Sequence, residues 1–159
     1  MTDSAPHFAF GQPEENPGYL LWQLSMRWQR EVNAALRTLE LTHTQFVILA
    51  ATRWLELQAQ RQQLDPPSKT AIGEHTSLDR MLAAKTVRKL SDRQWLTTRP
   101  DLQDSRAHLV QTTRAGRSRL DQALDLVNEV DKRLFGQLPQ EAITGLREVW
   151  QHSERHDAS

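Results

Sequence analysis

The sequence predicts a mainly α-helical fold with a small β-ribbon, made of six helices and a hairpin of two to three strands. Two observations lead to this fold class. Over most of the 159 residues, apolar side chains recur every three or four positions, which is the spacing of amphipathic helices. The exceptions are residues 95–98 and 108–112, two strand-favouring segments around a polar stretch, which is the pattern of a β-hairpin.

The N-terminal part predicts an arm followed by one long helix. Residues 1–17 hold three prolines and one glycine with little apolar periodicity, so we expect a flexible or loosely docked arm. From Gly18 to Leu39, apolar residues such as Leu24, Trp28 and Val32 step by three or four along one face of a helix.

A second helix is predicted to start at a capping box formed by Thr42 and Gln45. The threonine hydroxyl accepts from a first-turn amide, and the glutamine reaches back to the cap. Phe46 and Trp54 are expected on its apolar side. The helix must end before residues 65–67, because proline disfavours helical geometry in the residue before it.

A helix-turn-helix pair follows. Ser68 is a suitable N-cap for a short helix, and Thr76 with Asp79 places a cap and an acid at the start of a longer one. The apolar side of the longer helix is expected to consist of Leu78, Leu82, Val87 and Leu90.

Two further helices are predicted after the ribbon. One runs from Thr113 to about Leu134 with a wide apolar face, and Gly136 and Pro139 separate it from the last. The last helix carries Ile143, Leu146, Val149 and Trp150 on its apolar side. A small three-helix body cannot bury all these faces, so a second copy of the chain is the expected partner, giving a homodimer.

The overall charge is balanced, but its distribution is not. The whole chain has 20 basic and 20 acidic residues, whereas residues 68–119 contain eleven basic residues against five acidic ones. This segment therefore carries a net charge of plus six, and the remainder carries minus six. A basic middle within a neutral protein is the electrostatic footprint expected for binding phosphate.

The composition also excludes several classes of protein. The chain has no cysteine, which excludes disulfides, thiol nucleophiles and cysteine-zinc sites. No apolar run approaches the length of a membrane span, and no signal sequence or lipid-anchor motif is visible, so we expect a cytoplasmic protein with no membrane partner.

The order of the elements places a recognition helix beside a hairpin wing, which is a winged helix-turn-helix. Lys85 and Arg88 are expected on the exposed side of the recognition helix, and Arg99 and Arg106 on the wing. A helix can enter the major groove while a basic hairpin lies along phosphates or enters the minor groove. Each charge alone is better explained as part of an ordinary solvated surface, because charged helix faces are common. The hypothesis of double-stranded DNA binding rests on their co-location.

The wing segment carries the most specific pattern in the sequence. Residues 90–107 read LSDRQWLTTRPDLQDSRA and continue as HLVQTTRAG to residue 116. This stretch resembles the wing signature of the MarR family of bacterial transcription regulators. Upstream, residues 41–49 resemble the second helix of that family, and residues 78–81 resemble the start of its recognition helix.

The resemblance implies a ligand-responsive repressor that binds a pseudo-palindromic operator as a homodimer. It implies a winged-helix DNA-binding lobe at residues 41–113 and a dimerisation region at residues 18–40 and 114–156. In the family the wing aspartate fixes the hairpin and the arginine at its tip approaches the minor groove, roles carried over to Asp104 and Arg106. The predicted DNA-binding residues are Lys69, Ser77, Arg80, Ala84, Lys85, Arg88, Arg99, Asp104 and Arg106.

Three positions depart from the family pattern. Gln94 stands where the family has glycine, and a non-glycine residue in a left-handed cap would cost roughly 1 kcal/mol, which leaves the turn geometry open. The family also prefers arginine at the position of Thr98 and an aliphatic residue at that of Thr112.

The resemblance further implies a pocket between the two lobes for a small aromatic or phenolic anion. The candidate ligand-binding residues are Trp22, Met26, His43 and Phe46, with Trp28 beside them. Their alternative role is ordinary core packing, which is the usual role of aromatic residues at helical spacing.

Two other functions compete with DNA binding. His152 and His156 lie four residues apart, a spacing that can hold a metal, but they lie at the chain end with no third ligand nearby. No phosphate-binding glycine loop or Ser/His/Asp order is visible, so we expect no catalytic residue, metal or cofactor. A winged-helix adaptor that binds only proteins is the alternative, and the basic excess of the wing and helix-turn-helix favours DNA.

Overall fold

The computed structural model describes residues 9–157, and the side chains of residues 9–153. Residues 1–8 of the predicted arm lie outside the described residues. The fold is mainly helical with one antiparallel hairpin, as predicted. Its elements are α1 (Pro17–Leu36), α2 (His43–Arg61), α3 (Lys69–Thr76), α4 (Arg80–Asp92), β1 (Leu96–Pro100), β2 (His108–Thr112), α5 (Arg114–Phe135) and α6 (Gln140–Asp157), with short 3-10 turns at Pro13–Glu15 and Arg37–Leu39.

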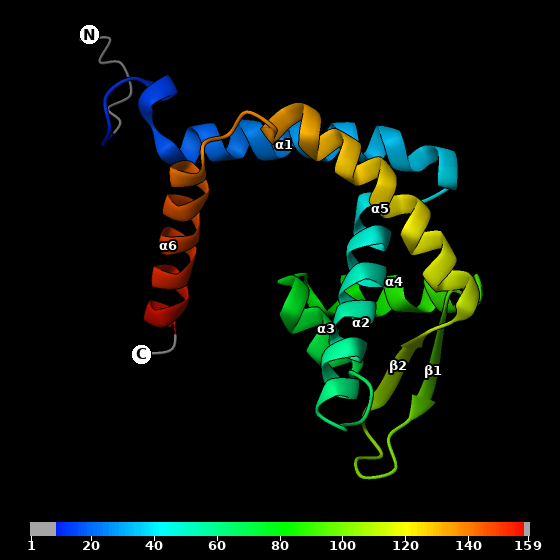
Figure 1. Ribbon diagram of the computed structural model, residues 1–159. Coiled ribbons are helices and arrows are strands. Elements are labelled where there is room, and N and C mark those ends of the chain that lie inside the picture. Colours follow the sequence, from blue (N-terminus) through cyan, green and yellow to red (C-terminus); the bar gives the residue numbers. More distant parts are fainter. Residues whose placement is uncertain (1–8, 158–159) are drawn as a thin grey trace, which may run out of the picture.

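The elements form a frame and a lobe (Figure 1). Helices α1 and α5 pack side by side, and α2 runs from them into a lobe that also holds α3, α4 and the hairpin. Helix α6 stands apart from this lobe. None of the described helices combines the length and apolarity needed to span a membrane.

The helix starts follow the predicted capping residues with one exception. The capping box is confirmed, since Thr42 accepts from the amide of Gln45 and the glutamine side chain accepts from the amide of Thr42. Asp79 caps α4 by accepting from the amide of Leu82 at 3.0 Å. The prediction that Thr76 caps α4 is wrong: it is the last residue of α3, and its hydroxyl donates to the carbonyl of Ile72.

The wing is a two-stranded sheet with a remnant of a third strand. Leu96 pairs with Thr112 at its base, and Pro100 with His108 near its tip. On the outer edge of β2, Ser68 forms an isolated bridge with Leu109, and the amide of Val110 donates to the carbonyl of Pro67 at 2.8 Å. The third strand is therefore reduced to one bridge beside the start of α3.

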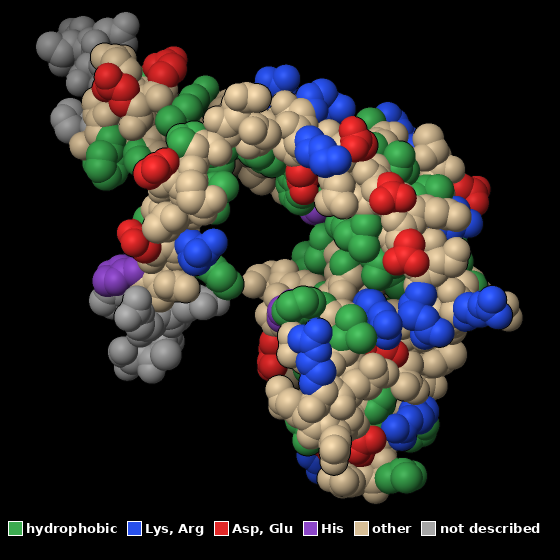
Figure 2. Space-filling model, in the orientation of Figure 1, with side chains coloured by type: hydrophobic (Ala, Val, Ile, Leu, Met, Phe, Trp, Pro, Cys, Tyr) green, Lys and Arg blue, Asp and Glu red, His purple; other side chains and the backbone are tan. Residues whose placement is uncertain are grey.

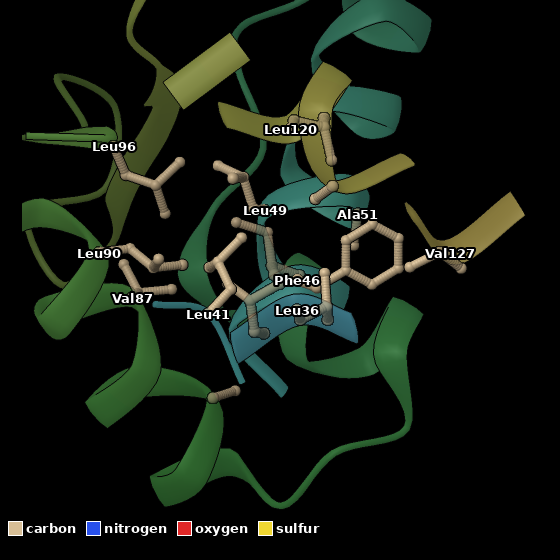
Figure 3. Packing of buried hydrophobic residues seen from close by; sticks show 14 of the residues in the cluster. Leu36, Leu41, Phe46, Leu49, Ala51, Val87, Leu90, Leu96, Leu120 and Val127 are labelled. Carbon is tan, nitrogen blue, oxygen red and sulfur yellow. The ribbon is translucent and has the colours of Figure 1, made fainter. Parts of the chain in front are cut away.

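One hydrophobic core joins the frame to the lobe (Figure 3). It brings together side chains from α1, α2, α4, β1 and α5, including Leu36, Leu49, Leu90, Leu96 and Leu120. In the lobe, the predictions that Trp54 and Leu82 lie on the apolar sides that pack inward are wrong, because both side chains are exposed. Apolar residues occupy a wider part of the surface of these helices than the neighbouring elements cover.

The turn after α4 keeps the left-handed geometry in spite of Gln94, whose φ is 59°. The amide of Trp95 donates to the carbonyl of Leu90, and that of Gln94 to Ser91, both at 2.9 Å. This is the hydrogen-bond pattern of a Schellman motif, which requires a left-handed residue before the last donor. The two hydrogen bonds and the packing of Leu90 and Trp95 hold the glutamine in this conformation.

Candidate nucleic-acid interface

Helix α4 has one buried and one exposed side. Its buried side carries Ala83, Thr86, Val87 and Leu90, spaced by three or four residues. The opposite side exposes Arg80, Ala84, Lys85 and Arg88. Four of the predicted DNA-binding residues therefore lie on the solvent side of this helix.

Two shallow hollows connect this side of α4 to α3. One, of about 340 Å³, is lined by residues that include Lys69, Ser77 and Arg80. The other, of about 290 Å³, is lined by Lys69, Met81, Ala84, Lys85 and Arg88. Lys69 borders both hollows, so four cations from the two helices share one face. Figure 2 shows several Lys and Arg side chains over the lobe.

The tip of the wing is shaped by two aspartates. The carboxylate of Asp104 accepts from the amide of Arg106 at 2.9 Å, and that of Asp101 from the amide of Gln103 at 2.8 Å. The amide of Asp101 also donates to the carbonyl of Ala107 at 3.0 Å. These bonds close the turn and leave the Arg106 side chain exposed to solvent.

Arg99 has a partner that sequence reasoning missed. Its guanidinium forms an ion pair of 3.2 Å with Asp65, which lies in the loop before α3. Both side chains are exposed, and a surface ion pair contributes only about 0–1 kcal/mol. Arg99 can therefore exchange this carboxylate for a phosphate at little cost.

Met81 is a second residue that sequence reasoning missed. Its side chain is 80% exposed on the first turn of α4, among the cations of the smaller hollow. The DNA-binding residues predicted on this helix were Arg80, Ala84, Lys85 and Arg88, and they did not include this methionine. Its spacing to Ala84 and Lys85 was the available signal, since residues three and four apart share a helix face.

A buried carboxylate holds the outer edge of β2. Glu56 of α2 is 3% exposed, and its carboxylate accepts from the Thr112 amide at 3.0 Å and from the Thr112 hydroxyl at 2.5 Å. Arg53 pairs with the same carboxylate at 3.3 Å. An aliphatic residue at position 112 could not donate the second bond, which gives a physical reason for threonine there.

A groove of about 590 Å³ lies between α2, α3 and α5. Its lining includes Phe46, Arg53, Trp54, His75 and Leu124 and is predominantly apolar. Of the four predicted ligand residues, only Phe46 lines this groove. Trp54, which sequence reasoning placed on the buried side of α2, is exposed here.

The other predicted ligand residues lie elsewhere. Trp22 and Met26 are exposed on α1. His43 packs edge-on against Trp28, with ring centroids 5.0 Å apart, and burial lowers the pKa of its imidazole. Its Nε2 atom is buried without a hydrogen-bond partner, while the Trp28 indole donates to Asp131 at 2.6 Å.

The described residues contain no group of three or more side chains that could hold a metal ion. The side chain of His156, one of the two histidines considered for such a site, lies outside the described residues.

An exposed cationic helix beside a hairpin, held on a helical frame, defines a winged helix-turn-helix protein. Solved structures of other proteins share this fold. CouR from Rhodococcus jostii RHA1, bound to p-coumaroyl-CoA, matches with a TM-score of 0.76 at 20% identity, over 89% of this chain and 93% of that chain. A mutant of MarR from E. coli, complexed with operator DNA, matches with a TM-score of 0.71 at 20% identity, over 86% of this chain and 91% of that chain.

The likeness shows that this chain has the fold of the MarR family of regulators, so the predicted resemblance is confirmed for the fold. In sequence, the chain is 28% identical to an uncharacterised HTH-type transcriptional regulator, YdcH, from Bacillus subtilis (strain 168), over 92% of this chain and 97% of that relative. No family model matches the sequence.

Proposed function

We propose that this protein is a DNA-binding transcription regulator that acts as a homodimer on a pseudo-palindromic operator. The observation that carries the proposal is the cationic face formed by Lys69, Arg80, Lys85 and Arg88, with Arg99 and Arg106 on the adjoining wing. Side chains of this kind neutralise phosphates and donate to the guanine acceptors of the major groove. The MarR structure in complex with operator DNA shows that this fold can bind DNA.

The homodimer rests on apolar surface that the single chain leaves uncovered. Val149 and Trp150 of α6 are 67% and 61% exposed, and Leu20, Leu21 and Trp22 of α1 are also exposed. Figure 2 shows open space between α6 and the lobe. Two recognition helices related by a two-fold axis enter successive major grooves about 34 Å apart, which demands a pseudo-palindromic site.

A ligand response rests on the groove between α2, α3 and α5. Its predominantly apolar lining, which also includes Arg53 and His75, suits an aromatic or phenolic anion. The groove lies where α5 of the frame meets α2 and α3 of the lobe. A ligand that favours a dimer with the wrong helix spacing would release DNA by population shift, and this is how a repressor would be induced.

The proposal is tested by fluorescence anisotropy of the purified protein with DNA from upstream of its own gene and with duplexes selected from random sequence. We expect tight binding that weakens steeply with salt and exceeds binding to a scrambled duplex. Equal and weak binding to selected and scrambled duplexes would contradict DNA recognition and favour a role in binding proteins.

Replacing Arg106 with alanine is expected to weaken operator binding about tenfold and to lower the slope of log K against log salt by about one. The side chain is exposed at the wing tip and serves no bond within the described structure that would alter the fold when lost. Anisotropy titrations at several salt concentrations measure both quantities. Arg30→Ala, an exposed arginine on α1, is the matched control and should leave the slope unchanged. An unchanged slope for Arg106→Ala would argue against a phosphate contact by the wing.

The double variant Leu146→Glu, Val149→Glu is expected to fold but to remain monomeric. Both side chains are exposed on α6 in the single chain, so the new charges cost little until a second copy covers them. Sedimentation equilibrium measures the change, and half-site rather than full-site DNA binding should accompany it. Thr144→Glu adds one such charge on the polar side of α6 and should stay dimeric. A dimeric double variant would show that the interface lies elsewhere.

A further inference from the structure

The exposed face of α4 has a restricted chemical content. Over its first three turns the exposed residues are Arg80, Met81, Leu82, Ala84, Lys85, Arg88 and Lys89. They are cations and apolar side chains. The whole helix contains neither asparagine nor glutamine, and the one acidic residue within it, Asp92, is its last residue.

Met81 is the most exposed large apolar residue of this face, at 80%. Single exposed apolar side chains are common on protein surfaces. This one, however, lines the hollow of about 290 Å³ together with Ala84, and the remaining lining consists of Lys69, Lys85 and Arg88. None of the five lining residues is acidic, so the hollow combines apolar and cationic side chains.

The edges of the base pairs in the major groove match this content selectively. Guanine offers two acceptors to arginine or lysine, and thymine alone offers a methyl group. Adenine is read by the amide of asparagine or glutamine, and cytosine by a carboxylate acceptor. The first turns of α4 expose neither kind of group, since the Asp79 side chain already accepts from the amide of Leu82.

We propose that Met81 is a specificity-determining residue that contacts the C5-methyl group of a thymine in each operator half-site, while the neighbouring cations contact phosphates or guanine. This inference rests on the proposed function, because it names what the α4 face of a DNA-binding protein recognises. The flexible thioether side chain adapts to the position of the methyl group.

The test replaces single thymines of a selected operator with deoxyuridine, which removes only the C5-methyl group. When one thymine is changed in a single half-site, we expect the affinity of the wild-type protein to fall about fourfold, which is the effect of one buried methyl group. When the symmetric thymine is changed in both half-sites, the affinity should fall about fifteenfold. Met81→Ala should bind the thymine operator more weakly and be indifferent to deoxyuridine at that position. Met81→Leu, which keeps an apolar side chain of similar size, should retain most of the discrimination.

The outcomes separate the inference from the function on which it rests. If wild-type protein binds every deoxyuridine duplex as tightly as the thymine operator, the assignment of Met81 is overturned while DNA recognition stands. The same holds if Met81→Ala keeps the full sensitivity to deoxyuridine. Absence of any sequence-selective binding would overturn the proposed function and this inference together. Since Met81 packs little within the chain, circular dichroism should show that both variants fold.

Discussion

Replacement of Gly116 by alanine is expected to lower the free energy of unfolding by about 3 kcal/mol and the melting midpoint by roughly 10 °C. Gly116 lies in the first turn of α5, where a Cβ atom would overlap the carbonyl oxygen of Trp95 and come within 2.8 Å of its carbonyl carbon. Because these are backbone atoms, no side-chain rotation relieves the overlap. Thermal and urea unfolding measure the loss.

The surroundings of Trp95 make a backbone shift costly. Its carbonyl accepts from the Thr113 amide at 3.1 Å, and its ring lies near the guanidinium groups of Arg93 and Arg119, at 4.9 and 5.1 Å from the ring centroid. The turn after α4, the base of the wing and the start of α5 are therefore fixed together. Operator affinity should fall with stability, because the wing would move relative to α4.

Gly145→Ala is the matched control for this variant. Gly145 lies within α6, and an added Cβ would meet no atom within 4 Å. Alanine is favoured over glycine inside a helix by about 0.5–1 kcal/mol, so this substitution should stabilise the protein slightly. Equal melting midpoints for Gly116→Ala and the wild-type protein would mean that Gly116 does not lie against the Trp95 carbonyl.

Replacement of Glu56 by alanine is expected to cost about 3 kcal/mol of folding free energy. The substitution removes the acceptor for both the amide and the hydroxyl of Thr112 and leaves these donors buried without a partner. It also removes the partner of Arg53. Because Thr112 ends β2, we expect the base of the wing to loosen, which hydrogen exchange at the Thr112 amide would detect.

A double-mutant cycle isolates the Glu56–Thr112 pair. Glu56→Gln keeps an acceptor for the amide, whereas Thr112→Val removes only the hydroxyl donor. Groups joined directly by a hydrogen bond should show a coupling free energy of about 1 kcal/mol or more in urea unfolding. If the losses of folding free energy in the two single variants simply add, Glu56 stabilises the fold through its other contacts and not through the threonine hydroxyl.

The local signals in the sequence were sufficient for most of the fold. The capping residues Thr42, Ser68 and Asp79 mark helix starts because a side-chain oxygen satisfies a free amide wherever the chain enters a helix. Apolar periodicity indicated the helices, and strand-favouring residues indicated the hairpin. The error at Thr76 arose because Thr76 and Asp79 have the spacing of a cap and a first-turn acid, whereas in the structure α3 extends to Thr76 and Asp79 itself caps α4.

The candidate interface was predictable in part for the same reason. Lys85 and Arg88 lie on the side of α4 opposite its apolar residues, so helical spacing alone places them at the surface. Spacing could not show that Lys69 of α3 joins them, since this depends on how α3 packs against α4. Nor could it reveal Asp65 as the partner of Arg99, because the two are 34 residues apart in sequence.

By itself, the sequence determined the helices, the hairpin and the basic character of the middle segment, because each depends on residues within a few positions of one another. Only the tertiary structure decided which apolar residues are covered, why Gly116 must be glycine and where the carboxylate of Glu56 finds its donors. These features depend on contacts between distant segments. The left-handed turn at Gln94 depends on both kinds of contact, since its hydrogen bonds are local but the packing of Trp95 holds it in place.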